Sequence, residues 1–109
     1  MTNVTIYKEP DGKFIGFDCI GHAGYAEEGS DIVCAAISIL VINTINAIEV
    51  FAKDRFQVSQ QEDAGIISFR FDEDCSHDAN LLVQTMILGL KEIQTSFGNG
   101  YISLMFKEV

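Results

Sequence analysis

Apolar and polar side chains alternate along the first residues of the chain. Residues 4–8 (VTIYK) follow this alternation, and residues 13–20 (KFIGFDCI) are rich in aromatic and branched side chains. A turn-forming segment, residues 9–12 (EPDG), separates them. This pattern predicts two β-strands joined as a hairpin.

Two longer stretches repeat apolar residues at helical spacing. Residues 31–54 are apolar over most of the helix circumference, which is typical of a helix central to the core or shared with a partner chain. Residues 78–97 carry one apolar stripe, which predicts a helix lying on a sheet, with Ser76 as its N-cap. The members of the stripe are Leu81, Leu82, Met86, Ile87, Leu90 and Ile93.

Three further strands complete the expected elements. Residues 55–59 and 65–71 predict a second hairpin, and residues 101–107 predict a closing strand. The order ββαββαβ indicates an α+β fold: a single layer of about five strands, mixed or antiparallel, with two long helices packed on it. The length of 109 residues suits a single domain spanning residues 1–109.

Composition narrows the setting in which such a domain works. The N-terminus lacks the basic and apolar regions of a secretory signal, and polar residues interrupt the most apolar run, residues 32–50, so no membrane span is expected. Three cysteines, an odd number, fit reduced thiols. We therefore expect a cytoplasmic protein.

The net charge limits the partners. The formal charge is −9, and no basic cluster occurs in the sequence. Binding to nucleic acid depends on Lys and Arg gathered on one face, so nucleic acid is a poor partner. A basic peptide or protein would be attracted instead.

Candidate chemistry is concentrated in residues 21–38 (GHAGYAEEGSDIVCAAIS). Ser30 or Asp31 is placed to cap the helix that follows, so Cys34 lies in its first turn with either cap. Unpaired N–H groups and the helix dipole favour a thiolate there, which makes Cys34 the best candidate nucleophile. His22, at the end of a strand, is expected to lie beside Cys34 as its base.

Each of the residues around this pair has more than one role open to it. Asp31 either caps the helix or orients His22 as a third catalytic member. Ser38, one turn after Cys34, either faces the same cleft in a supporting role or bonds back to its own backbone. The glycine-bracketed loop between His22 and Asp31 is a candidate substrate loop, with Gly24, Glu27, Glu28 and Gly29 as its notable members.

Other cysteine chemistries leave two alternatives. No matched ligand pair for zinc, no phosphate-binding arginine after Cys34 and no papain-type or caspase-type flank is found, and neither a metal nor a cofactor is expected. A thiol redox sensor pairing Cys34 with Cys19 or Cys75 remains possible, as does a non-catalytic peptide-binding module. Loss of His22 would abolish cleavage by a protease, whereas it would leave oxidation of a redox sensor intact and only weaken binding by a module.

The segments 21–23 (GHA) and 29–38 (GSDIVCAAIS) resemble the signature of the ribosomal-processing cysteine proteases (Prp, formerly the YsxB-like family). Ile37 is a mild departure, because valine is also familiar there. The resemblance implies a homodimeric bacterial endopeptidase without a cofactor. Its substrate would be the N-terminal extension of a 50S ribosomal protein, cut near paired phenylalanines in a step needed for ribosome assembly. Cys34 would be the nucleophile and His22 the general acid/base, with backbone N–H groups at the helix start stabilising the oxyanion.

Overall fold

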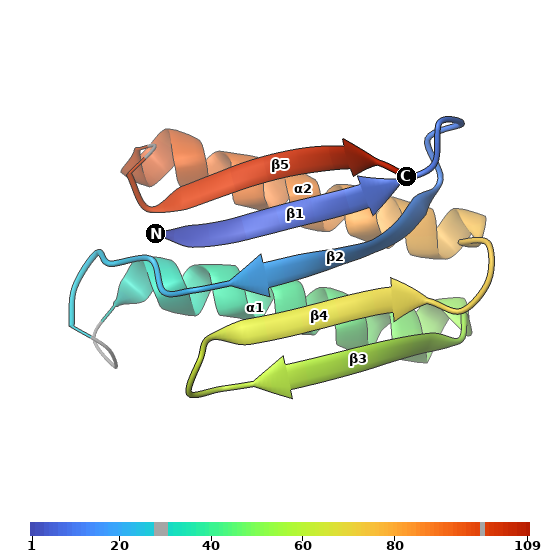
Figure 1. Cartoon of the computed structure of the whole chain (residues 1–109), viewed down its shortest axis with the longest axis horizontal. Helices are drawn as coiled ribbons and strands as arrows, with labels where there is room; N and C mark the ends of the chain where they lie inside the picture. The colour runs from blue at the N-terminus through green and yellow to red at the C-terminus, as the bar shows by residue number, and fades with distance from the viewer. Residues whose placement is uncertain (28–30, 99) are drawn as a thin grey trace.

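The computed structural model describes residues 1–27, 31–98 and 100–109 and confirms the expected α+β class (Figure 1). Five strands and two α-helices follow one another in the order ββαββαβ. The elements are β1 (Thr2–Lys8), β2 (Phe14–Ile20), α1 (Ile32–Ala47), β3 (Phe56–Gln61), β4 (Ile66–Phe71), α2 (His77–Phe97) and β5 (Ile102–Glu108).

The strands form one mixed sheet in the order β3-β4-β2-β1-β5. All neighbouring strands are antiparallel except β1 and β5, which run parallel. Helix α2 forms the crossover connection that leads the chain from β4 to β5 in this direction. Both helices lie on the same side of the sheet (Figure 1). No helix of the described residues covers the other side, so the fold has two layers.

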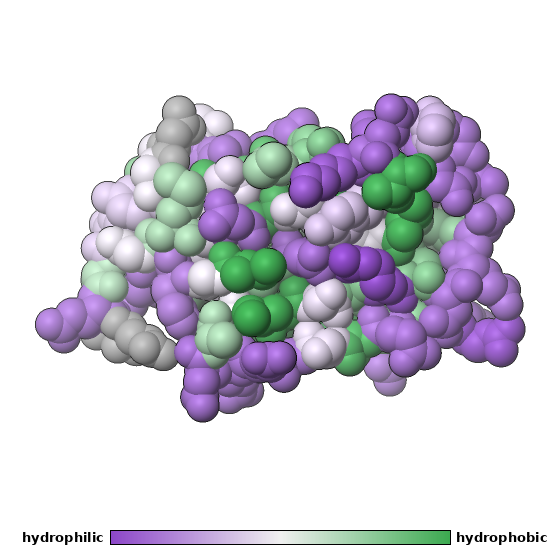
Figure 2. Space-filling view, viewed as in Figure 1, coloured by the Kyte–Doolittle hydropathy of each residue, from purple (hydrophilic) through white to green (hydrophobic). Residues whose placement is uncertain are grey.

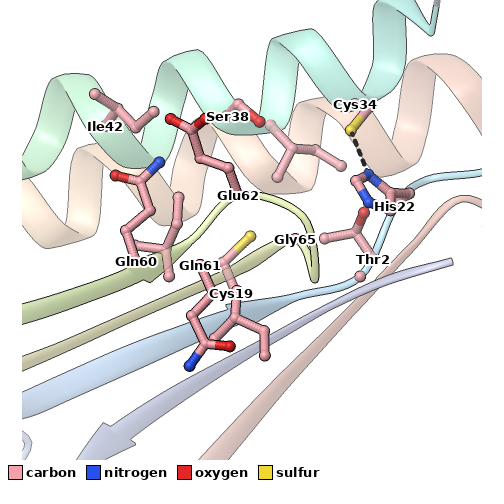
Figure 3. A pocket seen from close by; sticks show the side chains of 14 residues that line it. Thr2, Cys19, His22, Cys34, Ser38, Ile42, Gln60, Gln61, Glu62 and Gly65 are labelled. Atoms are coloured by element: carbon pink, nitrogen blue, oxygen red, sulfur yellow. Dashed lines mark hydrogen bonds between the residues drawn. The ribbon is translucent and has the colours of Figure 1, made fainter. Parts of the chain in front are cut away.

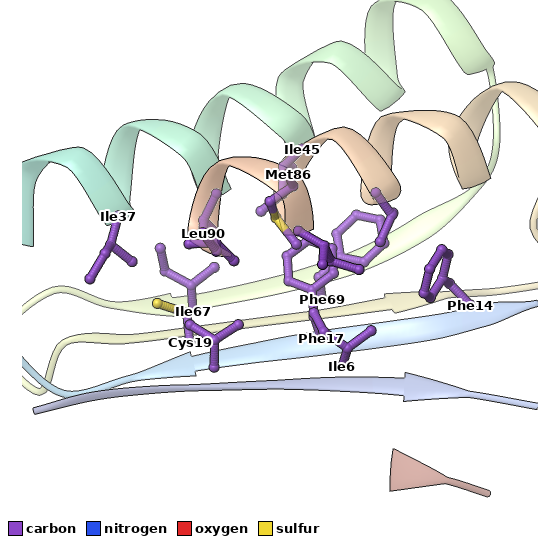
Figure 4. Packing of buried hydrophobic residues seen from close by; sticks show 14 of the residues in the cluster. Ile6, Phe14, Phe17, Cys19, Ile37, Ile45, Ile67, Phe69, Met86 and Leu90 are labelled. Carbon is purple, nitrogen blue, oxygen red and sulfur yellow. The ribbon is translucent and has the colours of Figure 1, made fainter. Parts of the chain in front are cut away.

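The core lies between the sheet and the two helices (Figure 4). Phe17 of β2 stacks on Phe69 of β4 with ring centroids 4.8 Å apart. The stripe expected for α2 is correct except at Leu81, which is exposed because the helix turns a neighbouring face toward the sheet. The buried residues of α2 are Ala79, Val83, Met86, Ile87, Leu90 and Ile93.

The first helical stretch is less regular than its sequence suggests. A π-helical turn, Ile48–Ala52, follows α1, and Lys53 then ends the helix in a left-handed conformation with φ of 62°. Residues Ile32–Ala52 together are long and apolar enough, by length and composition, to cross a membrane, with mean hydropathy of 2.0, despite the polar residues that interrupt the run. One side of this helix packs in the core, and a core helix passes the same test.

The uncovered face of the sheet carries a polar network. The Arg70 guanidinium forms two hydrogen bonds with the Asp18 carboxylate, at 2.9 and 3.1 Å, and stacks over the Tyr7 ring. Ser68 and Tyr7 also donate to Asp18. Burial raises the pKa of Asp18, but the bonds from Arg70, Ser68 and Tyr7 outweigh it and lower that pKa overall. Figure 2 shows this side as mostly hydrophilic with small apolar patches.

Candidate active site

The start of α1 is fixed by Asp31. Its Oδ1 accepts a hydrogen bond from the backbone N–H of Cys34 at 2.9 Å, which makes Asp31 the N-cap and places Cys34 in the first turn as expected. Its Oδ2 accepts from the N–H of Tyr25 at 2.8 Å. Ser30, the other candidate cap, lies outside the described residues. Asp31 therefore joins the loop to the helix.

These contacts determine the ionisation of Asp31. Burial pushes the pKa of the Asp31 carboxyl upward, but hydrogen bonds from backbone N–H groups, chiefly that of Cys34, bring the pKa below its usual value. No hydrogen bond between Asp31 and His22 is found among the described residues. The geometry thus favours the capping role over the histidine-orienting one.

Cys34 and His22, twelve residues apart, meet at one end of the sheet. The Cys34 Sγ lies 3.7 Å from His22 Nδ1 (Figure 3). Both side chains are open to solvent to some extent, so a substrate can reach them. A thiol in contact with an imidazole at a helix start is the arrangement that activates cysteine nucleophiles.

The position of His22 depends on the β3–β4 turn. The N–H of Gly21 donates to the carbonyl of Gly65 at 2.8 Å. Gly65 has φ of 63°, and a Cβ there would lie 2.9 Å from Gly21 O and 3.1 Å from His22 Nε2. Only glycine permits this close approach and this conformation. Gly65 thus holds the end of β2, and His22 with it.

Two clefts flank the Cys34–His22 pair. The first, of about 200 Å³, has an apolar floor that includes the buried side chains of Ile37 and Ile67. Gln60 and Glu62 lie among its other lining residues (Figure 3). The second, of about 360 Å³, lies on the loop side of the pair. Its lining residues are His22, Gly24, Ala26, Asp31, Cys34, Ala35 and Ser38.

The expected supporting residues are placed differently from one another. Ser38 lines both clefts, and no hydrogen bond from its hydroxyl to another described residue is found, which favours the cleft-facing role. Gly24 borders the second cleft, whereas Glu27 is exposed and is not among its lining residues. Glu28 and Gly29 lie outside the described residues.

The N–H groups at the helix start are partly engaged. That of Cys34 donates to the Asp31 side chain, and that of Ala35 donates to the Asp31 carbonyl at 3.0 Å. These two donors are therefore engaged within the protein while the cap is in place. The Ser38 hydroxyl remains as a donor on the cleft side of the same helix.

The other two cysteines are buried. Burial raises the pKa of Cys19 to about 11, with a smaller contribution from Cys34, and it raises that of Cys75 to about 11, with help from Asp54. Cys75 lines separate surface hollows and has no access to Cys34, whereas Cys19 is at the floor of the first cleft. Within the described ranges, no three His, Cys, Asp or Glu side chains gather as a metal site.

Sequence reasoning missed Thr2 and Gly65, which both line the first cleft. Thr2 lies on the same face of β1 as Val4 and Ile6, because the three are alternate residues of the strand. A polar residue on this buried face was therefore the sequence feature that could have indicated its role. Gly65 gave no signal beyond a glycine in a turn. Strand pairing, rather than local sequence, brings both to the site.

A two-layer α+β fold with a solvent-accessible thiol against an imidazole is typical of a cysteine hydrolase. The model of the family described as Cysteine protease Prp matches residues 1–103. The chain is also 33% identical over 101 residues to the ribosomal processing cysteine protease Prp of Bacillus subtilis, covering 89% of this chain and 90% of that protein. This protein belongs to the Prp family of cysteine proteases.

Solved structures agree with this assignment. The chain has a TM-score of 0.92 and 31% identity to an essential ribosomal processing protease Prp from S. aureus, crystallised with a covalently linked product peptide. A second structure of that protease, in complex with a substrate peptide, gives a TM-score of 0.87 and 30% identity. Each match covers 98% of this chain and 100% of the other. The fold and a protease activity on peptides are therefore shared.

Proposed function

We propose that this protease removes the N-terminal extension of a 50S ribosomal protein, with Cys34 as nucleophile and His22 as general acid/base. The contact of 3.7 Å between Cys34 Sγ and His22 Nδ1 carries the assignment of roles. The names of the relatives, ribosomal processing proteases, support the class of substrate. Removal of the extension would be a step of ribosome assembly.

The reaction follows from the two side chains. His22 Nδ1 takes the proton of the Cys34 thiol, and the thiolate attacks the carbonyl carbon of the scissile peptide bond. The same imidazolium then protonates the leaving amine, so the C–N bond breaks and a thioester remains on Cys34. His22 next takes a proton from water, and the resulting hydroxide attacks the thioester carbon. The C–S bond breaks, the product acid leaves, and the Cys34 thiolate takes the proton back from the imidazolium.

The first cleft suits an apolar side chain next to the scissile bond. Its floor is formed by Ile37 and Ile67 close to Cys34, and burial of an aromatic ring against such a floor is favourable. We propose that it receives one of the paired phenylalanines of the extension. The Ser38 hydroxyl lies between the two clefts, placed to contact the backbone of the same peptide.

The acidic composition supports a basic substrate. With a net charge of −9, the protease attracts a positively charged ribosomal protein over a distance set by the ionic strength. The specificity constant for full-length substrate is therefore expected to fall as salt increases. A flat response to salt would remove this attraction from the account.

The test of the function is direct cleavage. A peptide spanning the extension and the mature start of the ribosomal protein is incubated with the protein and with the variants Cys34→Ser and His22→Ala, and the products are read by mass spectrometry. One internal cut that disappears in both variants supports the proposal. Intact peptide that still binds would instead indicate a binding module, and cleavage that survives His22→Ala would refute the assigned roles.

We also propose that the protein acts in the cytoplasm as a homodimer joined through its helices. Ile39 and Phe51, on α1 and the π-helical turn after it, are 68% and 71% exposed, as is Leu88 of α2 at 71%, and such a set of apolar side chains favours a second copy. Sedimentation of the protein and of Ile39→Lys tests this. A wild-type monomer at micromolar concentration would refute it.

A further inference from the structure

One buried hydroxyl faces the site without a hydrogen-bond partner. Thr2, at the start of β1, is only 2% exposed, and its Oγ1 is the one buried side-chain oxygen or nitrogen in the described part of the chain that lacks a partner. A buried hydroxyl without a partner is unfavourable, and valine has nearly the same shape without that disadvantage. Thr2 is therefore unexplained as a core residue.

The neighbour of this hydroxyl is His22. The register of β1 on β2 pairs Asn3 with Ile20, so Thr2 lies opposite Gly21, the residue that precedes His22. Thr2 and His22 line the same cleft, and in Figure 3 the Thr2 side chain points toward the His22 ring on the side away from Cys34. The second ring nitrogen of His22 is directed to this side, near Gly65.

The tautomer of His22 makes this neighbour chemically important. For Nδ1 to accept the proton of Cys34, the neutral ring must carry its own proton on Nε2. An imidazole base needs an acceptor for that N–H to hold its orientation and to stabilise the imidazolium. Asp31, the carboxylate expected in this role, is engaged with backbone N–H groups instead.

We propose that Thr2 is the positioning residue of the active site, its hydroxyl oxygen accepting a hydrogen bond from Nε2–H of His22 when the ring receives the proton of Cys34. This inference rests on the proposed function of Cys34 and His22. The contact forms during catalysis, since hydrogen bonds at active sites often tighten only in the reacting complex. No contact with the substrate is required of Thr2.

The test compares Thr2→Val with Thr2→Ser, which retains the hydroxyl. Loss of a hydrogen bond to an ionised group is expected to lower kcat about tenfold with KM unchanged. The acidic limb of the pH–rate profile, where the imidazole base becomes protonated, moves to lower pH, because the imidazolium loses its acceptor. Thr2→Ser restores both. The melting temperature of Thr2→Val stays the same or rises, because an unpaired buried hydroxyl has been removed.

Thr44→Val is the matched control. Thr44 is also buried, but its hydroxyl donates to the Leu40 carbonyl at 2.7 Å, so its loss should lower the melting temperature slightly and leave kcat unchanged. Wild-type kcat and an unmoved pH profile in Thr2→Val would overturn the positioning role alone, as would lost activity that Thr2→Ser fails to restore. Absence of cleavage by the unmodified protein would instead overturn the proposed function.

Discussion

The substitution Asp31→Asn separates the two roles open to that residue. Asn is as good an N-cap as Asp, so its Oδ1 keeps the hydrogen bond from the Cys34 N–H. In the unmodified protein the N–H of Tyr25 donates to Asp31 Oδ2 at 2.8 Å. In the variant an NH₂ group replaces Oδ2, so two donors face each other and this hydrogen bond is lost. The loop loses its attachment while the helix keeps its cap.

The expected loss of stability follows from these contacts. Losing a hydrogen bond to a carboxylate costs about 1.5 kcal/mol, and losing a negative charge at a helix start about 0.5 kcal/mol. The total of about 2 kcal/mol corresponds to a melting temperature about 10 °C lower for a chain near 100 residues. KM should rise, because Ala26, next to Tyr25, borders the second cleft, and kcat should stay unchanged.

The loss should also depend on pH. Hydrogen bonds lower the pKa of Asp31 in the folded protein, so its contribution is fully present above the unfolded value of about 3.9 and is lost as the pH falls through the folded value. The difference in melting temperature between the protein and Asp31→Asn should therefore shrink below about pH 4. Calorimetry from pH 3 to 7 measures it.

A control and a contrary outcome make the assay decisive. Ser76 caps α2 at the other end of the molecule, with Oγ accepting from the Ala79 N–H at 3.1 Å, so Ser76→Ala should lower stability and leave kcat and KM unchanged (Figure 1). A loss in kcat for Asp31→Asn on the order of 10⁴, as in catalytic triads, with an unchanged melting temperature would show that Asp31 orients His22.

Two further predictions concern the turn and the thiols. Gly65→Ala should lower stability by about 1–3 kcal/mol and reduce kcat/KM, because the added Cβ displaces His22. Gly12 also has a positive φ but open space around it, so Gly12→Ala should affect stability alone. Unchanged kinetics in Gly65→Ala would refute the role of Gly65 in holding His22. Iodoacetamide at pH 7.5 should modify Cys34 once per chain, because burial raises the pKa values of Cys19 and Cys75 to about 11; a second rapid modification seen by mass spectrometry would contradict this.

Local pattern was sufficient for the elements and for part of the site. Apolar periodicity and capping residues predicted both helices, the hairpins and the first-turn position of Cys34, because these depend on nearby residues. The π-helical turn Ile48–Ala52 was not predicted, since its residues continue the same apolar pattern. Thr2 and Gly65 were missed because only strand register, set by the whole sheet, places them beside His22.

The free edge of the sheet has a mechanical consequence for the cleft. β3 is hydrogen-bonded on one side only, and all but the first of its residues are exposed, yet its end supplies Gln60 and Gln61 to the first cleft. An edge strand with so little buried surface is the part of a sheet that opens at the smallest free-energy cost. We therefore expect the width of the cleft to depend on how firmly β3 pairs with β4, so that substitutions along β3 far from Cys34 change substrate preference without touching a catalytic group.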